Sequence, residues 1–138
     1  MPSSKTLIRA GGVFNILAVL FHLGFWWFFG WEQELERMSA FNGEILVLLN
    51  LVLIVVFGFI AWVSLRFPEE LVNTSLGRTI LGFCVGLFAV RGVSGWIVPG
   101  IPTGVEIAVT AAILFALTAY GVPLSRRSEE EVTPTHAS

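Results

Sequence analysis

The sequence predicts an all-α integral membrane protein, a bundle of four transmembrane helices with both termini cytoplasmic. Four long apolar runs, almost free of ionisable residues, predict the helices. The composition agrees, because 55% hydrophobic and 13% charged residues leave too little polar surface to cover a soluble globule of this size. A third observation, the uneven distribution of basic residues between the connections, predicts the orientation.

Each run is long enough to cross a membrane as a helix. A helix rises about 1.5 Å per residue, so roughly 20 residues cross a hydrocarbon core about 30 Å thick. No run shows the alternation of a barrel strand. The spans are expected at about 6–29, 43–65, 76–98 and 103–123, in a single domain of residues 1–124. The tail, residues 125–138, turns from basic to acidic and then to Thr, Pro and Ser, which favours a disordered cytoplasmic segment.

The first span follows Lys5 and Arg9, an arrangement that also occurs in secretory signal peptides. A signal peptide has a shorter apolar region that ends in small residues, whereas this run ends in a cluster of aromatic residues. The cluster comprises Phe25, Trp26, Trp27, Phe28, Phe29 and Trp31. Such a cluster is typical of the aromatic belt at a membrane interface, so the first span is expected to be retained.

The basic residues predict the side of the membrane on which each connection lies. If the four spans alternate in direction, one side carries Lys5, Arg9, Arg66, Arg78, Arg126 and Arg127. The opposite side carries Arg37 with Glu32, Glu34 and Glu36. Basic residues favour the cytoplasmic side, which predicts cytoplasmic termini. The net charge of -2 provides no basic footprint for nucleic acid.

The connections are short. In the first, Trp31, Leu35 and Met38 recur at helical spacing with charged residues on the other faces. This pattern indicates either an amphipathic helix in the outer interface or a polar hairpin loop. Residues 73–75, Asn-Thr-Ser, offer capping groups to the third span, and residues 98–102 form an uncharged outer turn.

Small residues predict how the third and fourth spans pack. Gly82 and Gly86 lie four residues apart on the third span, and alanines line one side of the fourth: Ala108, Ala112, Ala116 and Ala119. Small side chains let helix backbones approach closely in a membrane. We expect these two faces to contact each other within the bundle; the alternative is a seam between two copies of the chain.

The candidate functional residues are the polar side chains within the spans. They are Asn15, His22, Glu44, Asn50, Arg91 and Glu106. At about 1.5 Å per residue, the four ionisable members, one from each span, all lie within roughly 10 Å of the outer face. Asn15 lies two helical turns from His22 and shares its face.

Among these candidates, Arg91 has the strongest need for a counter-charge. A charge at the centre of a span costs about 2.5 to 3.5 kcal/mol on insertion scales, and such residues usually face the bundle and find a counter-charge. Glu44 and Glu106 are the expected partners, since a guanidinium can hold a carboxylate through two hydrogen bonds. The alternative is that Arg91 extends to the outer headgroups.

Both glutamates also have structural explanations. Residues 103–106, Thr-Gly-Val-Glu, match the capping-box pattern at a helix start. Residues 42–44, Asn-Gly-Glu, place Glu44 in the first turn of the second span, where the helix dipole favours negative charge.

The sequence favours binding over catalysis. No serine or cysteine lies beside a base, no nucleotide-binding fingerprint is present, and the chain contains no aspartate. No metal site and no cofactor are expected, because the spans offer few ligands and no recurrent spacing. Cys84 is expected to act as a small apolar residue. The cytoplasmic half of the second and fourth spans contains few polar residues, which are Trp62, Ser64, Thr118 and Tyr120.

The first two predicted spans and their connection contain a series of short motifs: residues 21–26 (Phe-His-Leu-Gly-Phe-Trp), the Trp31 segment, Met38-Ser39, Asn42 and Leu49-Asn50. In these motifs the chain resembles a group of small four-span bacterial membrane proteins that has no assigned function. The chain is also similar to DoxX-like membrane proteins, in size and topology only. The resemblance implies a bacterial inner-membrane location and a shared role for His22 and Asn50, and it transfers no catalytic residue.

These features predict a non-catalytic membrane protein that binds an amphipathic ligand, a lipid or a quinone, in a polar pocket open to the outer face. The pocket is expected to combine aromatic walls with the layer of His22, Glu44, Arg91 and Glu106. One alternative is an accessory subunit whose Gly82 and Gly86 face docks a larger complex, and another is an oligomeric proton or ion pathway. The expected partners are membrane lipids, with a homo-oligomer or a larger membrane complex as further candidates.

Overall fold

A computed structural model describes residues 2–97 and 103–132 of the chain, and this part consists of helices without strands. Four helices are long and apolar enough to cross a membrane, at Ser4–Leu23, Ala40–Arg66, Ser75–Gly95 and Gly104–Arg126. The predicted all-α class is therefore confirmed for the described residues, and the four helices of spanning length and apolar composition indicate a multi-pass membrane protein. The turn expected at 98–102 lies outside the described residues.

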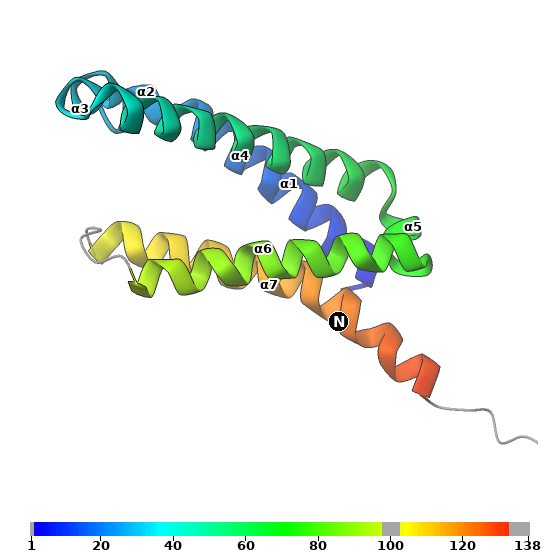
Figure 1. Ribbon diagram of the computed structural model, residues 1–138. Helices are drawn as coiled ribbons and strands as arrows, with labels where there is room; N and C mark the ends of the chain where they lie inside the picture. Colours follow the sequence, from blue (N-terminus) through cyan, green and yellow to red (C-terminus); the bar gives the residue numbers. More distant parts are fainter. Residues whose placement is uncertain (1, 98–102, 133–138) are drawn as a thin grey trace, which may run out of the picture.

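The spanning helices form two hairpins (Figure 1). Helix α1 (Ser4–Leu23) packs along α4 (Ala40–Arg66), and α6 (Ser75–Ile97) packs along α7 (Thr103–Val132). The hairpins meet at the end where α1 begins, which we call the terminal end, and α5 (Pro68–Asn73) lies there as well. They diverge toward the opposite end, which we call the distal end. Contacts between the hairpins run mainly through α1 with α7 and α5 with α6.

The hydrophobic core lies in the terminal half and the middle of the molecule. Its buried residues are Ile8, Phe57, Ile60, Val63, Leu71, Leu81, Cys84, Phe88, Ala116, Ala119 and Tyr120. Cys84 belongs to this apolar core, as the sequence indicates. Many large apolar side chains elsewhere on the spans are exposed, as expected of surfaces that face lipid.

The distal connection between α1 and α4 is helical. After the short helix α2 (Phe25–Phe28), Gly30 adopts a left-handed conformation with φ of 57° and precedes α3 (Trp31–Arg37). Trp31 is buried and Leu35 is partly buried, while Glu32 and Arg37 are exposed. Of the two interpretations from sequence, the structure has the amphipathic helix rather than the polar loop.

Ser39 begins α4, because its hydroxyl accepts a hydrogen bond from the backbone N–H of Asn42 at 3.3 Å. The first turn of α4 therefore starts at Ala40 and contains no acidic residue. The expectation that Glu44 occupies this turn is wrong, since the serine cap starts the helix earlier than the Asn42 segment suggests. Glu44 lies one turn further along an exposed face.

Thr74 joins α5 to α6. Its hydroxyl donates to the backbone carbonyl of Glu70 at 2.8 Å and accepts from the backbone N–H of Gly77 at 2.9 Å. The predicted capping role of residues 73–75 is confirmed for this threonine. The same turn brings the backbones of α5 and α6 together at Gly77, where a Cβ atom would lie 2.5 Å from the Cα of Leu71.

The structure does not bring the two small-residue faces together. A Cβ atom added to Gly82 or Gly86 would meet no atom within 4 Å, and Ala108 is exposed. Helices α6 and α7 approach each other on a different face instead. There, a Cβ on Gly92 would lie 3.4 Å from Ile113. Two glycines four apart predict a close approach but not which neighbour provides it, and here the face of Gly82 and Gly86 is left open.

Helix α7 differs from the expectation of a disordered tail from Ser125, because it continues to Val132. Residues 125–131 are Ser, Arg and Glu, and Arg and Glu are good helix formers. A helix that already crosses the membrane supplies the nucleus, so extending it costs little. The rest of the tail, residues 133–138, lies outside the described residues.

An ion pair joins α1 to α5 at the terminal end. The Lys5 ammonium lies 2.7 Å from the Glu69 carboxylate, and both side chains are exposed. The hydrogen bond and the positive charge of Lys5 lower the pKa of Glu69 below its ordinary value of 4.5. Because the pKa is lower in the folded protein, this pair stabilises the fold above pH 4.5 and loses its effect as the pH falls through the folded pKa.

We therefore expect Lys5→Met to raise the pKa of Glu69 toward its ordinary value, since both leading causes of the shift are removed. A carboxyl ¹³C titration of the protein in micelles measures this. Lys5→Arg retains the charge and is the matched control, in which the pKa of Glu69 stays low. An unchanged Glu69 titration in Lys5→Met would show that the pair does not form.

Candidate functional site

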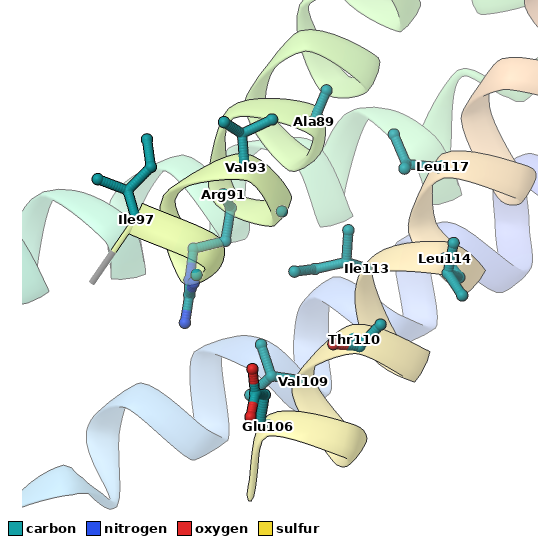
Figure 2. A pocket seen from close by; sticks show the side chains of 12 residues that line it. Ala89, Arg91, Val93, Ile97, Glu106, Val109, Thr110, Ile113, Leu114 and Leu117 are labelled. Carbon is teal, nitrogen blue, oxygen red and sulfur yellow. The ribbon is translucent and has the colours of Figure 1, made fainter. Parts of the chain in front are cut away.

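A groove between α6 and α7 is the main candidate site, and we call it the α6–α7 groove (Figure 2). Its volume is about 620 Å³. Among the described residues, its lining consists of Ala89, Arg91, Gly92, Val93, Gly95, Ile97, Glu106, Val109, Thr110, Ile113, Leu114 and Leu117. Most are apolar, and Arg91 and Glu106 are the ionisable residues among them. The charged residues lie toward the distal end, where α6 ends and α7 begins.

Arg91 lines one wall of this groove from the last turns of α6. A Cβ atom at Gly95 would lie 3.5 Å from its Nη1 atom, so the guanidinium lies along the helix over a residue without a side chain. The hydroxyl of Ser94 donates to the backbone carbonyl of Arg91 at 2.9 Å. The absence of side chains at positions 92 and 95 gives the arginine room within the groove.

Glu106 lies on the opposite wall, in the first turn of α7, as the sequence predicts. Thr110 lies four residues further along the same wall. The side chain of Thr103 is outside the described part of the structure, so the predicted capping box stays a prediction. The position of Glu106 at a helix start remains favourable for a negative charge.

The expected ion pair of Arg91 with Glu44 or Glu106 does not form. The described ion pairs within 4.0 Å include Lys5 with Glu69 and Arg37 with Glu34, and none joins Arg91 to either glutamate. Glu106 nevertheless shares the groove with Arg91, and Figure 2 shows both side chains extending into the space between the two helices. Of the four ionisable residues expected at one depth in the membrane, His22, Glu44, Arg91 and Glu106, only Arg91 and Glu106 line this groove.

Glu44 belongs to a separate, shallower groove of about 490 Å³ at the α3–α4 corner. Its other lining residues are Leu35, Ala40, Gly43, Val47, Leu48 and Leu51. This corner is on the α1–α4 hairpin, which has diverged from α6 and α7 at the distal end (Figure 1). The divergence is the physical reason why side chains at similar depth do not meet.

His22 and Asn50 contact each other within the α1–α4 hairpin. The Asn50 amide donates to the backbone carbonyl of His22 at 3.1 Å, and the His22 Nδ1 atom lies 2.8 Å from the carbonyl oxygen of Ala18. The imidazole stacks on Phe25 with ring centroids 4.7 Å apart and lies 5.1 Å from Phe57. His22 is thus a hydrogen-bonded packing residue of this hairpin and does not line the α6–α7 groove.

Asn15 lies apart from His22, in a buried polar network of the terminal half. Its amide donates to the backbone carbonyl of Gly11 and to the Tyr120 hydroxyl, both at 2.8 Å. The Ser64 hydroxyl lies 3.2 Å from the same tyrosine oxygen. These three side chains, from α1, α4 and α7, are fully or almost fully buried. Ser64 and Tyr120 are two of the few polar groups expected in this half of the second and fourth spans, and the structure brings them together with Asn15.

Sequence reasoning missed the role of Ser64 and Tyr120 because each is a single mildly polar residue in an apolar span. One signal was available, since Tyr120 is the only tyrosine in the chain. A tyrosine hydroxyl buried inside a membrane usually has a hydrogen-bond partner, and Asn15 is a fully buried amide of α1.

Aromatic rings join the two hairpins in the middle of the molecule. The ring of Phe88 lies 5.9 Å from Phe14, 6.1 Å from Phe57 and 6.3 Å from Tyr120, and Phe14 lies 5.5 Å from Phe115. Each spanning helix contributes at least one ring. Among the described residues, no ring contact joins the hairpins on the distal side of this layer, which leaves the α6–α7 groove without a cover from α1 or α4.

Within the described ranges, no group of three or more His, Cys, Asp or Glu side chains gathers in a geometry that could hold a metal ion.

Comparisons with protein-family models, with curated proteins and with solved structures find no match to this chain.

Proposed function

We propose that this multi-pass membrane protein binds an amphipathic molecule, such as a lipid or a quinone, in the α6–α7 groove and does not turn it over. The observation that supports this most is the combination of apolar side chains along both walls of the groove with two charged side chains toward its distal end. An apolar body with a polar head would find a matching surface along α6 and α7.

The charged residues support a function for the groove beyond packing. A charge within a membrane span is costly, and it usually faces the bundle or a cavity and marks a site. Arg91 and Glu106 line the same groove from α6 and α7, and a Cβ atom on the neighbouring Gly92 would lie 3.4 Å from Ile113. Charged side chains that line a groove in a membrane-spanning bundle without pairing with each other are candidates for contact with a ligand.

The location that we propose is the bacterial inner membrane, with the termini in the cytoplasm and the groove opening toward the outer side. The support is the charge distribution. Basic residues cluster at the terminal end, whereas α3 at the distal end carries Glu32, Glu34 and Glu36. The positive-inside tendency then places the distal end outside.

We expect Ala89→Trp to reduce ligand retention by at least about tenfold, equivalent to roughly 1.4 kcal/mol. Ala89 is exposed and lines the groove, so an indole there occupies the groove without disturbing the core. The measurement is native mass spectrometry of the purified protein, released from micelles that contain a defined mixture of phospholipids and a quinone.

The matched control is Ala111→Trp, since Ala111 is an exposed alanine of α7 that does not line the groove. This variant should retain the same molecules as the wild type. Equal retention by Ala89→Trp and Ala111→Trp would contradict the proposed site.

A further inference from the structure

Two opposite charges face the α6–α7 groove without neutralising each other. Arg91 and Glu106 line its two walls, and Figure 2 shows the guanidinium and the carboxylate directed into the same space. No ion pair within 4.0 Å joins them, although both line the same groove. The groove therefore presents a positive and a negative group whose charged atoms lie more than 4.0 Å apart.

This separation suits a ligand head that carries both charges. A guanidinium donates two parallel hydrogen bonds to a phosphate, a geometry that lysine cannot match. A glutamate carboxylate accepts hydrogen bonds from an ammonium group. A zwitterion placed between the two residues satisfies both charges at once, whereas a purely anionic head would leave Glu106 opposed by like charge.

The remaining lining residues indicate what is attached to such a head. Val93, Ile97, Ile113 and Leu114 make the walls apolar, and Val93, Ile97 and Leu114 are at least 60% exposed. Side chains that are exposed on a membrane-spanning helix face the lipid acyl chains. A free, water-soluble phosphoamine would gain nothing from these walls, so the apolar part favours a lipid.

We infer that the groove recognises a zwitterionic aminophospholipid, with its phosphate against Arg91 and its primary ammonium against Glu106. The inference rests on the proposed function and specifies the ligand class of the same groove. A primary ammonium donates hydrogen bonds to the carboxylate, while a trimethylammonium group has no N–H to donate. The groove should therefore distinguish phosphatidylethanolamine from both phosphatidylcholine and phosphatidylglycerol.

The test is competition for the wild-type protein among these three lipids, with identical acyl chains and equal amounts, read by native mass spectrometry. We expect phosphatidylethanolamine to be retained roughly fivefold over each of the others. Glu106→Gln should abolish the preference over phosphatidylglycerol while lipid retention persists. Arg91→Gln should lower retention of all three lipids together. Glu44→Gln, which removes the carboxylate of the separate groove, is the matched control and should behave as the wild type.

Each contrary result has a distinct meaning. Equal retention of phosphatidylglycerol and phosphatidylethanolamine by the wild type would overturn the inference and leave the proposed function standing. Loss of the preference in Glu44→Gln would overturn it as well. Soluble glycerophosphoethanolamine provides the last arm, because displacement of the lipid by this compound at equal concentration would show that the ligand is a soluble phosphoamine. Failure of the proposed function itself would appear separately, as normal lipid retention in Ala89→Trp.

Discussion

Replacing Gly77 with alanine is expected to lower the free energy of unfolding by about 3 kcal/mol or more. The added Cβ would lie 2.5 Å from the Cα of Leu71 and would also overlap the backbone carbonyl of Glu70. These are backbone atoms of α5, so no side-chain rotation can relieve the overlap. The α5–α6 turn must then open and lose the Thr74 hydrogen bonds that join the two helices. Unfolding in mixed micelles of increasing SDS content measures the loss.

Gly82→Ala is the matched control, because it makes the same chemical change in the same helix where a Cβ would meet nothing within 4 Å. Alanine is a better helix former than glycine by about 1 kcal/mol, so this variant should be as stable as the wild type or slightly more stable. If Gly77→Ala and Gly82→Ala were equally stable, α5 would not contact α6 as described.

Tyr120→Ala is expected to be the most destabilising change among the core side chains, at about 3 to 5 kcal/mol. The tyrosine is fully buried, stacks on Phe88 and receives the hydrogen bond of Asn15. Its removal leaves a large cavity at the point where α1, α4 and α7 meet, and it also leaves the polar atoms of Asn15 and Ser64 short of a partner. The same SDS unfolding measurement applies.

Tyr120→Phe separates the two contributions, because it retains the ring and removes only the hydroxyl. We expect it to cost about 1 to 2 kcal/mol, the penalty for buried polar groups that lose a hydrogen bond. Thr118→Ala is the control, since Thr118 is exposed and bonds only to the carbonyl of Leu114 within its own helix. A Tyr120→Phe variant as stable as Thr118→Ala would show that the network contributes no stability.

The sequence predicted the spans well because hydropathy is a local property. The apolar runs, the threonine cap at Thr74 and the amphipathic pattern of Trp31 and Leu35 each depend on residues within a few turns of one another. The same locality explains the position of Glu106 in the first turn of α7. Where a competing local signal was present, as at Ser39 before Asn42, the prediction of the helix start failed.

The candidate site could be predicted only in part. Rise along a helix gives the depth of each polar residue, and depth correctly placed Arg91 and Glu106 near one end of the bundle. Depth does not say which faces turn toward each other. In the structure, Asn15 therefore hydrogen-bonds to Tyr120 and does not lie with His22, and Glu44 lines a separate groove.

By itself, then, the sequence determined the class of the protein, the number of helices long enough to span, and the position of each charged residue along its helix. All three follow from composition and from distance along a helix axis. Only the tertiary structure decided which side chains share a site. It pairs α1 with α4 and α6 with α7, joins the pairs through contacts such as Asn15 with Tyr120 and Phe14 with Phe88, and lets them diverge toward the distal end. The physical reason is that lateral packing depends on contacts between distant segments, and these leave Arg91 and Glu106 facing one groove without a direct bond.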